Sequence, residues 1–133
     1  NLSYGDLWKP EHASGVTVRG HSALVGIGLW LESMGKLPYP LLDSYKNEKA
    51  MRANFDVILK TASEHKSAIA QYWSTENEAQ GAFRTNGAII GQTWDSTAFK
   101  LNQQAITLLR KGLMLCFLKQ QNSSSKILIQ RKS

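Results

Sequence analysis

The stretch AIIGQTWDSTAF, residues Ala88–Phe99, decides the fold. Its short apolar run, 88–90, is typical of a buried strand, and Gly91 lets another part of the backbone approach closely. The residues that follow Trp94, Asp95–Thr97, are all favoured helix N-caps. The indole and the carboxylate therefore come at a strand-to-helix corner, which is where open α/β sheets place ligands. The alternative is that Trp94 fills the core beside a capping Asp95.

The same succession of strand and helix occurs twice upstream. Residues 16–19 and 69–73 carry the β-branched and aromatic side chains that favour strands. Helices are predicted over residues 23–34, 48–65 and 79–84, with caps at Ser22, Asn47 and Ser74, the last pairing with Asn77 or Glu78. Alternation of strands and helices predicts an α/β fold, with a mostly parallel sheet flanked by helices.

Polar and aromatic side chains gather at the ends of the predicted strands. In a parallel sheet these ends meet along one edge, so we interpret the set as a ligand-facing edge. Its members are Arg19, His21 and Ser22 after the first strand, Trp73 and Ser74 after the second, and Trp94 and Asp95 after the third.

Two patterns predict how the helices pack. Gly26 and Gly28 lie inside the first helix, where each glycine costs about 1 kcal/mol, so we expect close packing of this helix against the sheet. In the second helix, apolar side chains recur at spacings of three and four residues, which indicates a buried stripe. The stripe is Met51, Phe55, Ile58, Leu59 and Ala62.

The net charge of +6 belongs to the end of the chain and not to the predicted domain. Residues 1–95 hold nine Lys/Arg against ten Asp/Glu, a net of −1, whereas residues 96–133 hold seven Lys/Arg and no acid, a net of +7. A nucleic-acid-binding domain is expected to spread basic residues and stacking aromatics over a folded face. This distribution argues against nucleic acid as the partner.

Several classes of protein are disfavoured by what the sequence lacks. Cys116 is the only cysteine, which excludes an internal disulfide and a CxxC metal site. His12, His21 and His65 share no metal-ligand spacing, and no catalytic constellation is evident, so we expect neither an enzyme nor a cofactor. No apolar run is long enough to span a membrane, and the polar sequence near Asn1 shows no signal peptide.

Three motifs together resemble the polyamine-type (spermidine/putrescine) extracellular solute-binding proteins of ABC transporters. They are residues 4–10 (YGDLWKP), 73–80 (WSTENEAQ) and 91–99 (GQTWDSTAF), and the resemblance covers residues 4–104. It implies one lobe of a type II periplasmic binding protein, a non-enzymatic role in transport and a ligand surface on that lobe. The family is periplasmic, but the compartment of this chain stays open.

By this resemblance, Trp94 matches the tryptophan that stacks on the ligand. Ser22 and Val25 match positions where polyamine binders carry acids for the ligand amines, and Arg19 and His21 stand nearby instead. Because buried ammonium groups must be paired, we expect polyamine binding to be weak or lost, and a small anion to suit Arg19 better.

Residues 105–133 depart from the family and form a divergent basic tail that either completes the fold or mediates association. A neighbouring reading frame of residues 107–117 is able to encode a run close to the family motif, so we hypothesise a frameshift near residue 105. Apolar residues 105–118 and the β-like residues 126–130 predict a homo-oligomer, most simply a dimer that pairs through residues 105–130. The alternatives are a structural or oligomerising protein without a ligand, and a nucleic-acid binder acting through the tail.

Overall fold

The computed structural model describes residues 3–94, 96–101, 103, 115–120 and 126–132. Its order of elements is η1 (Tyr4–Trp8), η2 (Pro10–His12), β1 (Val16–Val18), α1 (Gly20–Ser33), η3 (Leu41–Tyr45), α2 (Glu48–His65), η4 (Lys66–Ala68), β2 (Ile69–Tyr72), α3 (Glu76–Arg84), β3 (Ile90–Trp94), β4 (Leu115–Gln120) and β5 (Lys126–Lys132), where η marks a 3-10 helix. Residues 96–101 are helical. The α/β class predicted from the sequence is confirmed at this level.

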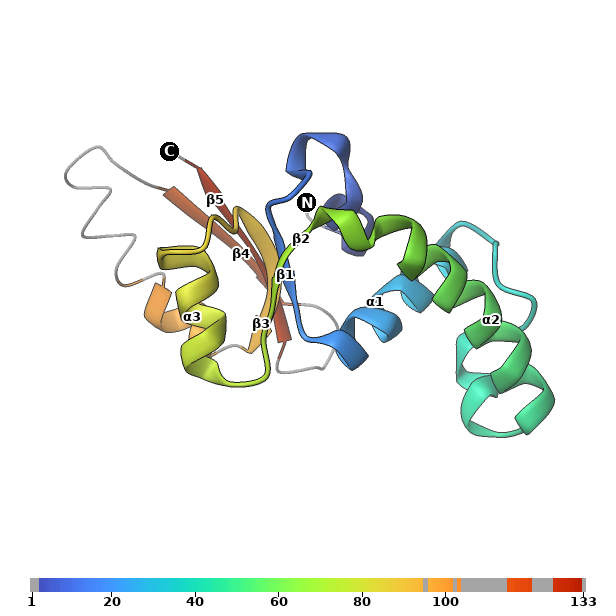
Figure 1. The fold of residues 1–133 in the computed structure, drawn as a ribbon. Coiled ribbons are helices and arrows are strands. Elements are labelled where there is room, and N and C mark those ends of the chain that lie inside the picture. The colour runs from blue at the N-terminus through green and yellow to red at the C-terminus, as the bar shows by residue number, and fades with distance from the viewer. Residues whose placement is uncertain (1–2, 95, 102, 104–114, 121–125, 133) are drawn as a thin grey trace.

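The sheet has the strand order β2-β1-β3-β5-β4. β1 lies between β2 and β3 and is parallel to both, as the sequence predicted. β5 then runs antiparallel to β3, and β4 antiparallel to β5, so the sheet as a whole is mixed. Figure 1 shows α1 and α2 on one side of the parallel strands and α3 on the other.

The core on the α1 side is built from the strand residues whose side chains point toward α1. Val16, Val18 and Ile90 are fully buried there against Leu7 and Ala23. Gly91 points to the other side, where an added Cβ would lie 2.5 Å from Thr17 Cγ2 and 2.6 Å from the Thr17 carbonyl oxygen. The close approach predicted at Gly91 is therefore real, and its partner is the neighbouring strand β1.

The packing predicted for the two glycines of α1 was wrong. Gly26 packs on the ring of Tyr4, 2.5 Å from where its Cβ would be, and Gly28 packs on Leu41 and Ile58. These partners come from η1, η3 and α2. The glycines thus admit other helices, and not the sheet.

The predicted stripe of α2 is confirmed in part, because Phe55 and Ala62 pack against the core cluster that contains Ile58. Ile58 is fully buried as expected, but Met51 and Leu59 are 40% and 50% exposed. The polar residue Asn54 is instead fully buried on this helix. Its side-chain amide accepts from the Tyr39 N–H at 3.1 Å and donates to Ser44 Oγ at 2.9 Å and to the Pro40 carbonyl at 3.3 Å. A buried, fully bonded polar residue is invisible to a search for apolar periodicity.

The helix starts agree in part with the predictions. Asn47 caps α2, accepting from the Ala50 N–H at 2.7 Å. α1, however, begins at Gly20 with Arg19 as its N-cap, so the prediction of Ser22 as the cap was wrong, and Ser22 lies buried in the first turn. α3 is capped by Thr75, one residue after the predicted Ser74, while Ser74 bonds the Glu78 carboxylate as expected.

The last two strands bear on the predicted dimer. Residues 127–130 are paired within the chain on both sides, with β3 and with β4, so these residues offer no free edge to a second copy. β4, residues 115–120, is the end strand of the sheet and pairs with β5, so its outer edge has no strand partner among the described residues. The remaining residues of the predicted interface, 105–114 and 121–125, lie outside the described part. Association remains a prediction that light scattering can test. No described helix is both long and apolar enough to cross a membrane.

Candidate functional site

The carboxyl ends of β1, β2 and β3 meet at one edge of the sheet, as the sequence predicted. The register pairs Val18 of β1 with Tyr72 of β2, and Thr17 with Gly91 of β3. Arg19, Trp73 and Trp94 each come within three residues of these pairs and lie in contact. We call these three residues the Arg–Trp cluster.

The two tryptophans of the cluster meet edge to face. Their ring centroids are 4.8 Å apart with an interplanar angle of 74°, which is a favoured arrangement of aromatic pairs. Trp73 is 2% exposed, and its Nε1–H donates to the Gln92 carbonyl at 2.8 Å. Trp94 is half-buried. Trp73 is therefore a fixed wall, and Trp94 is the ring that solvent can reach.

The Arg19 guanidinium lies over both rings. Its Cζ is 5.3 Å from the Trp94 centroid and 5.8 Å from the Trp73 centroid, within the range of a cation–π interaction. Such contacts contribute about 0.5–2 kcal/mol, depending on how far the cation is desolvated. The aromatic faces of the cluster thus already have a cation, supplied by the N-cap residue of α1.

The other predicted site residues hold different positions. Ser22 is buried, and its backbone carbonyl accepts at 3.4 Å from Nε2 of Gln92, the residue whose own carbonyl accepts from Trp73 of the cluster. His21 is exposed on the first turn of α1, and Ser74 is exposed beyond β2. Asp95 lies outside the described residues, so its role at the corner stays a prediction.

Two carboxylates follow Trp73 in the sequence, and both are engaged by neighbours. Hydrogen bonds from the Ser74 backbone N–H and hydroxyl lower the pKa of Glu78. Lys100, whose Nζ lies 3.1 Å from Glu76, lowers the pKa of Glu76 by its hydrogen bond. This ion pair links α3 to the helical residues 96–101. Both acids are therefore ionised at neutral pH and already have partners.

Sequence reasoning missed Gln92, which joins the elements beneath the cluster. It is 2% exposed, and its Nε2 donates to Tyr4 Oη at 3.2 Å as well as to Ser22. Among the described residues its Oε1 has no hydrogen-bond partner, although buried polar atoms are usually paired. A glutamine in the middle of an apolar strand carries no sequence signal beyond its own polarity.

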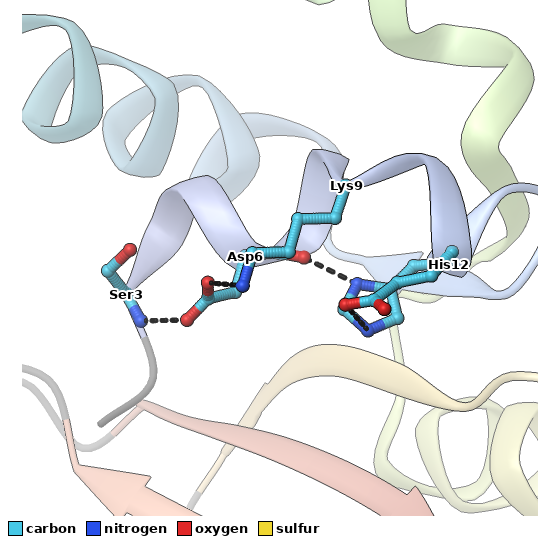
Figure 2. Close-up of polar contacts among 5 residues, drawn as sticks. Ser3, Asp6, Lys9 and His12 are labelled. Carbon is cyan, nitrogen blue, oxygen red and sulfur yellow. Dashed lines mark hydrogen bonds and ion pairs between the residues drawn. The ribbon is translucent and has the colours of Figure 1, made fainter.

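A second polar cluster lies in η1 and η2, apart from the sheet edge (Figure 2). The Asp6 carboxylate accepts from the Ser3 backbone N–H at 2.6 Å and pairs with Lys9 Nζ at 2.9 Å. The buried His12 bonds the Asp6 carbonyl through Nδ1. The described residues contain no group of three or more His, Cys, Asp or Glu that could hold a metal. We interpret this cluster as a fastening of the N-terminal segment.

Comparison of the chain with protein-family models, with curated proteins and with solved structures gave no significant match. The likeness of the three motifs to the polyamine-type solute-binding proteins therefore stays an interpretation of the sequence. What the chain does has to be proposed from the geometry of its own residues.

Proposed function

We propose that the chain is a non-enzymatic ligand-binding lobe of the kind used by ABC-transporter solute-binding proteins, in which polyamine binding is weak or lost. The observation that carries the proposal is the position of Arg19 over the rings of Trp73 and Trp94. The cluster stands where an open α/β sheet places its ligand. Its aromatic faces have the chemistry that attracts an organic cation, but the cation there is the protein's own.

The magnitude of the repulsion supports weak polyamine binding. Two like charges about 5 Å apart repel by about 3 kcal/mol at an effective dielectric of about 20. This repulsion would lower the affinity more than a hundredfold, and it exceeds the free energy that a cation–π contact with Trp94 would contribute. Glu76 and Glu78, which could pair with a ligand amine, are held by Lys100 and Ser74. A small anion has the better match to Arg19.

Calorimetry with putrescine on three forms of the full chain tests this proposal. We expect no micromolar binding to the unaltered chain. Arg19→Gln removes the competing charge, and Arg19→Glu adds a carboxylate for a ligand amine, so putrescine should bind measurably to Arg19→Glu and less tightly to Arg19→Gln. Adding Trp94→Ala to Arg19→Glu should remove the gain.

Two results would count against the proposal. Micromolar putrescine binding to the unaltered chain that is lost in Trp94→Ala would show that Arg19 does not block the rings. Failure of both folded Arg19 variants to bind would indicate that the edge is not a ligand surface, and would favour a structural role.

A further inference from the structure

A cavity of about 190 Å³ lies on the α1 side of the sheet. Its walls come from four elements: β1 supplies Val18, β2 supplies Ile69, α1 supplies Leu24 and Ile27, and α2 supplies Ala62. Apolar walls drawn from several rigid elements are typical of preformed small-molecule sites. The cavity is separate from the Arg–Trp cluster, none of whose three members lines it.

Two aromatic rings complete the cavity wall. Trp8 and His65 both line the cavity and are stacked, with centroids 5.5 Å apart and planes at 24°. Trp8 Nε1 is buried and has no hydrogen-bond partner among the described residues. Leaving a buried N–H unpaired costs about 1–3 kcal/mol. Because this N–H is closed to solvent, the two rings offer the cavity apolar contact surface and not a hydrogen-bond donor.

The charge of the lining residues indicates which charge a ligand would carry. Lys66 is the only lining residue with a permanent charge, and no aspartate or glutamate lines the cavity. Lys66 is exposed and Tyr72 is 56% exposed, so the cavity opens to solvent beside them. A carboxylate at this opening would meet a cation, whereas an ammonium group would meet a like charge and no partner.

We infer that this cavity is a binding site for a small monocyclic aromatic carboxylic acid, with its ring among the aliphatic walls and its carboxylate toward Lys66. An apolar cavity of about 150 Å³ is known to hold benzene, so 190 Å³ admits a single ring with a short side chain. It is below the range of about 300–1,000 Å³ for drug-sized ligands. The site is independent of the proposed function, because it uses another face and other residues.

Proton–nitrogen NMR of the full chain provides the test. The chain has four tryptophans, so its four indole N–H signals can be assigned by single Trp→Phe changes. Phenylacetate should shift the Trp8 indole signal saturably, because the bound ring alters the magnetic environment of the Trp8 ring that lines the cavity. Benzylamine, which has the same ring and the opposite charge, should bind at least about tenfold more weakly.

Matched variants separate the cavity from other surfaces. Ala62→Leu fills the cavity from α2 and should abolish binding, whereas Ala53→Leu, on the same helix and not among the lining residues, should leave it intact. Lys66→Glu alters only the opening and should weaken phenylacetate by about tenfold. Lys49→Glu makes the same charge change about 25 Å away, at the other end of α2, and should have no effect.

Three outcomes would overturn the inference. Equal binding of phenylacetate, benzylamine and toluene would show an apolar void with no preference for acids. Shifts confined to the Trp73 and Trp94 signals would place the ligand at the sheet edge. Absence of any saturable shift in the folded chain at millimolar phenylacetate would show that the cavity binds no such ligand.

Discussion

The indole N–H of Trp73 donates a hydrogen bond to the carbonyl of Gln92 at 2.8 Å, and so ties the end of β2 to β3 across the intervening β1. The two strands are not neighbours in the sheet, and this bond connects them directly at the edge where the Arg–Trp cluster lies. The bond is buried, so water could not replace it if the donor were removed.

Trp73→Phe keeps most of the ring and removes the donor. It should destabilise the chain by about 1–3 kcal/mol, because the Gln92 carbonyl would be left buried and unpaired. Urea unfolding measures the loss, with Trp94→Phe, on the half-buried ring, as the matched control. Equal costs for the two variants would mean that ring packing, and not the hydrogen bond, is what Trp73 contributes.

A pair of glycine substitutions tests the contact between β1 and β3. Gly91→Ala should destabilise by about 1–3 kcal/mol, because the new Cβ would lie 2.6 Å from the Thr17 carbonyl oxygen, which cannot move without the strand. Gly81→Ala in α3 meets no atom within 4 Å and should stabilise by about 0.5–1 kcal/mol. Thermal unfolding of both variants should show opposite signs, and a neutral Gly91→Ala would contradict the close approach.

Asn54 fastens the segment before α2 to that helix. Asn54→Ala removes three hydrogen bonds, to Tyr39, Pro40 and Ser44, and should cost about 2–3 kcal/mol, since buried partners are left unpaired. Asn77→Ala, at an exposed position of α3, should cost less than about 0.5 kcal/mol. Amide hydrogen exchange should accelerate at Tyr39 in the first variant alone, and unchanged protection there would argue against the role of Asn54.

Asp6 makes stability depend on pH at the acid end. Partial burial raises its pKa, but the hydrogen bonds from Lys9 and the Ser3 backbone outweigh this, and the pKa of Asp6 is lowered from its usual value of 3.8. A carboxylate with a lowered folded-state pKa stabilises the fold above its unfolded pKa. That contribution is lost as the pH falls through the folded pKa.

Asp6→Asn should therefore lower stability at pH 7 and lose less between pH 5 and pH 3 than the unaltered chain. Urea unfolding across this pH range measures both effects. Asp56→Asn, on the exposed side of α2, removes a charge without touching the N-terminal cluster. An equal response of both variants would assign the pH dependence to net charge and not to the contacts of Asp6.

How far the sequence predicts this structure depends on how local each signal is. The capping of α2 by Asn47, the close contact at Gly91 and the meeting of Trp73 with Trp94 follow from turn chemistry and from parallel strand order. The predicted start of α1 was wrong at Ser22. Serine is a favoured N-cap residue, but Ser22 lies buried in the first turn, where its carbonyl accepts a hydrogen bond from Gln92. Local propensity gives no warning of such a competing demand.

The parts of the site that escaped prediction are buried polar residues. Gln92 and Asn54 lie within apolar stretches and act through partners that are distant in the chain, Tyr4 and Tyr39. The unpaired Nε1 of Trp8 likewise depends on the tertiary surroundings of its ring. Periodicity identifies which faces are covered, but only the packed structure shows which polar atoms are covered with them.

The central position of β1 has a consequence for how the chain folds. Val16 pairs with Ile69 on one side and with Ile90 on the other, so the strand is made well before both of its partners. Closing such long loops costs entropy before any pairing is gained, and domains dominated by distant contacts fold slowly. On the ribosome, β1 would remain without strand partners until β2 and β3 have emerged, so this sheet cannot begin to assemble while β1 is being made.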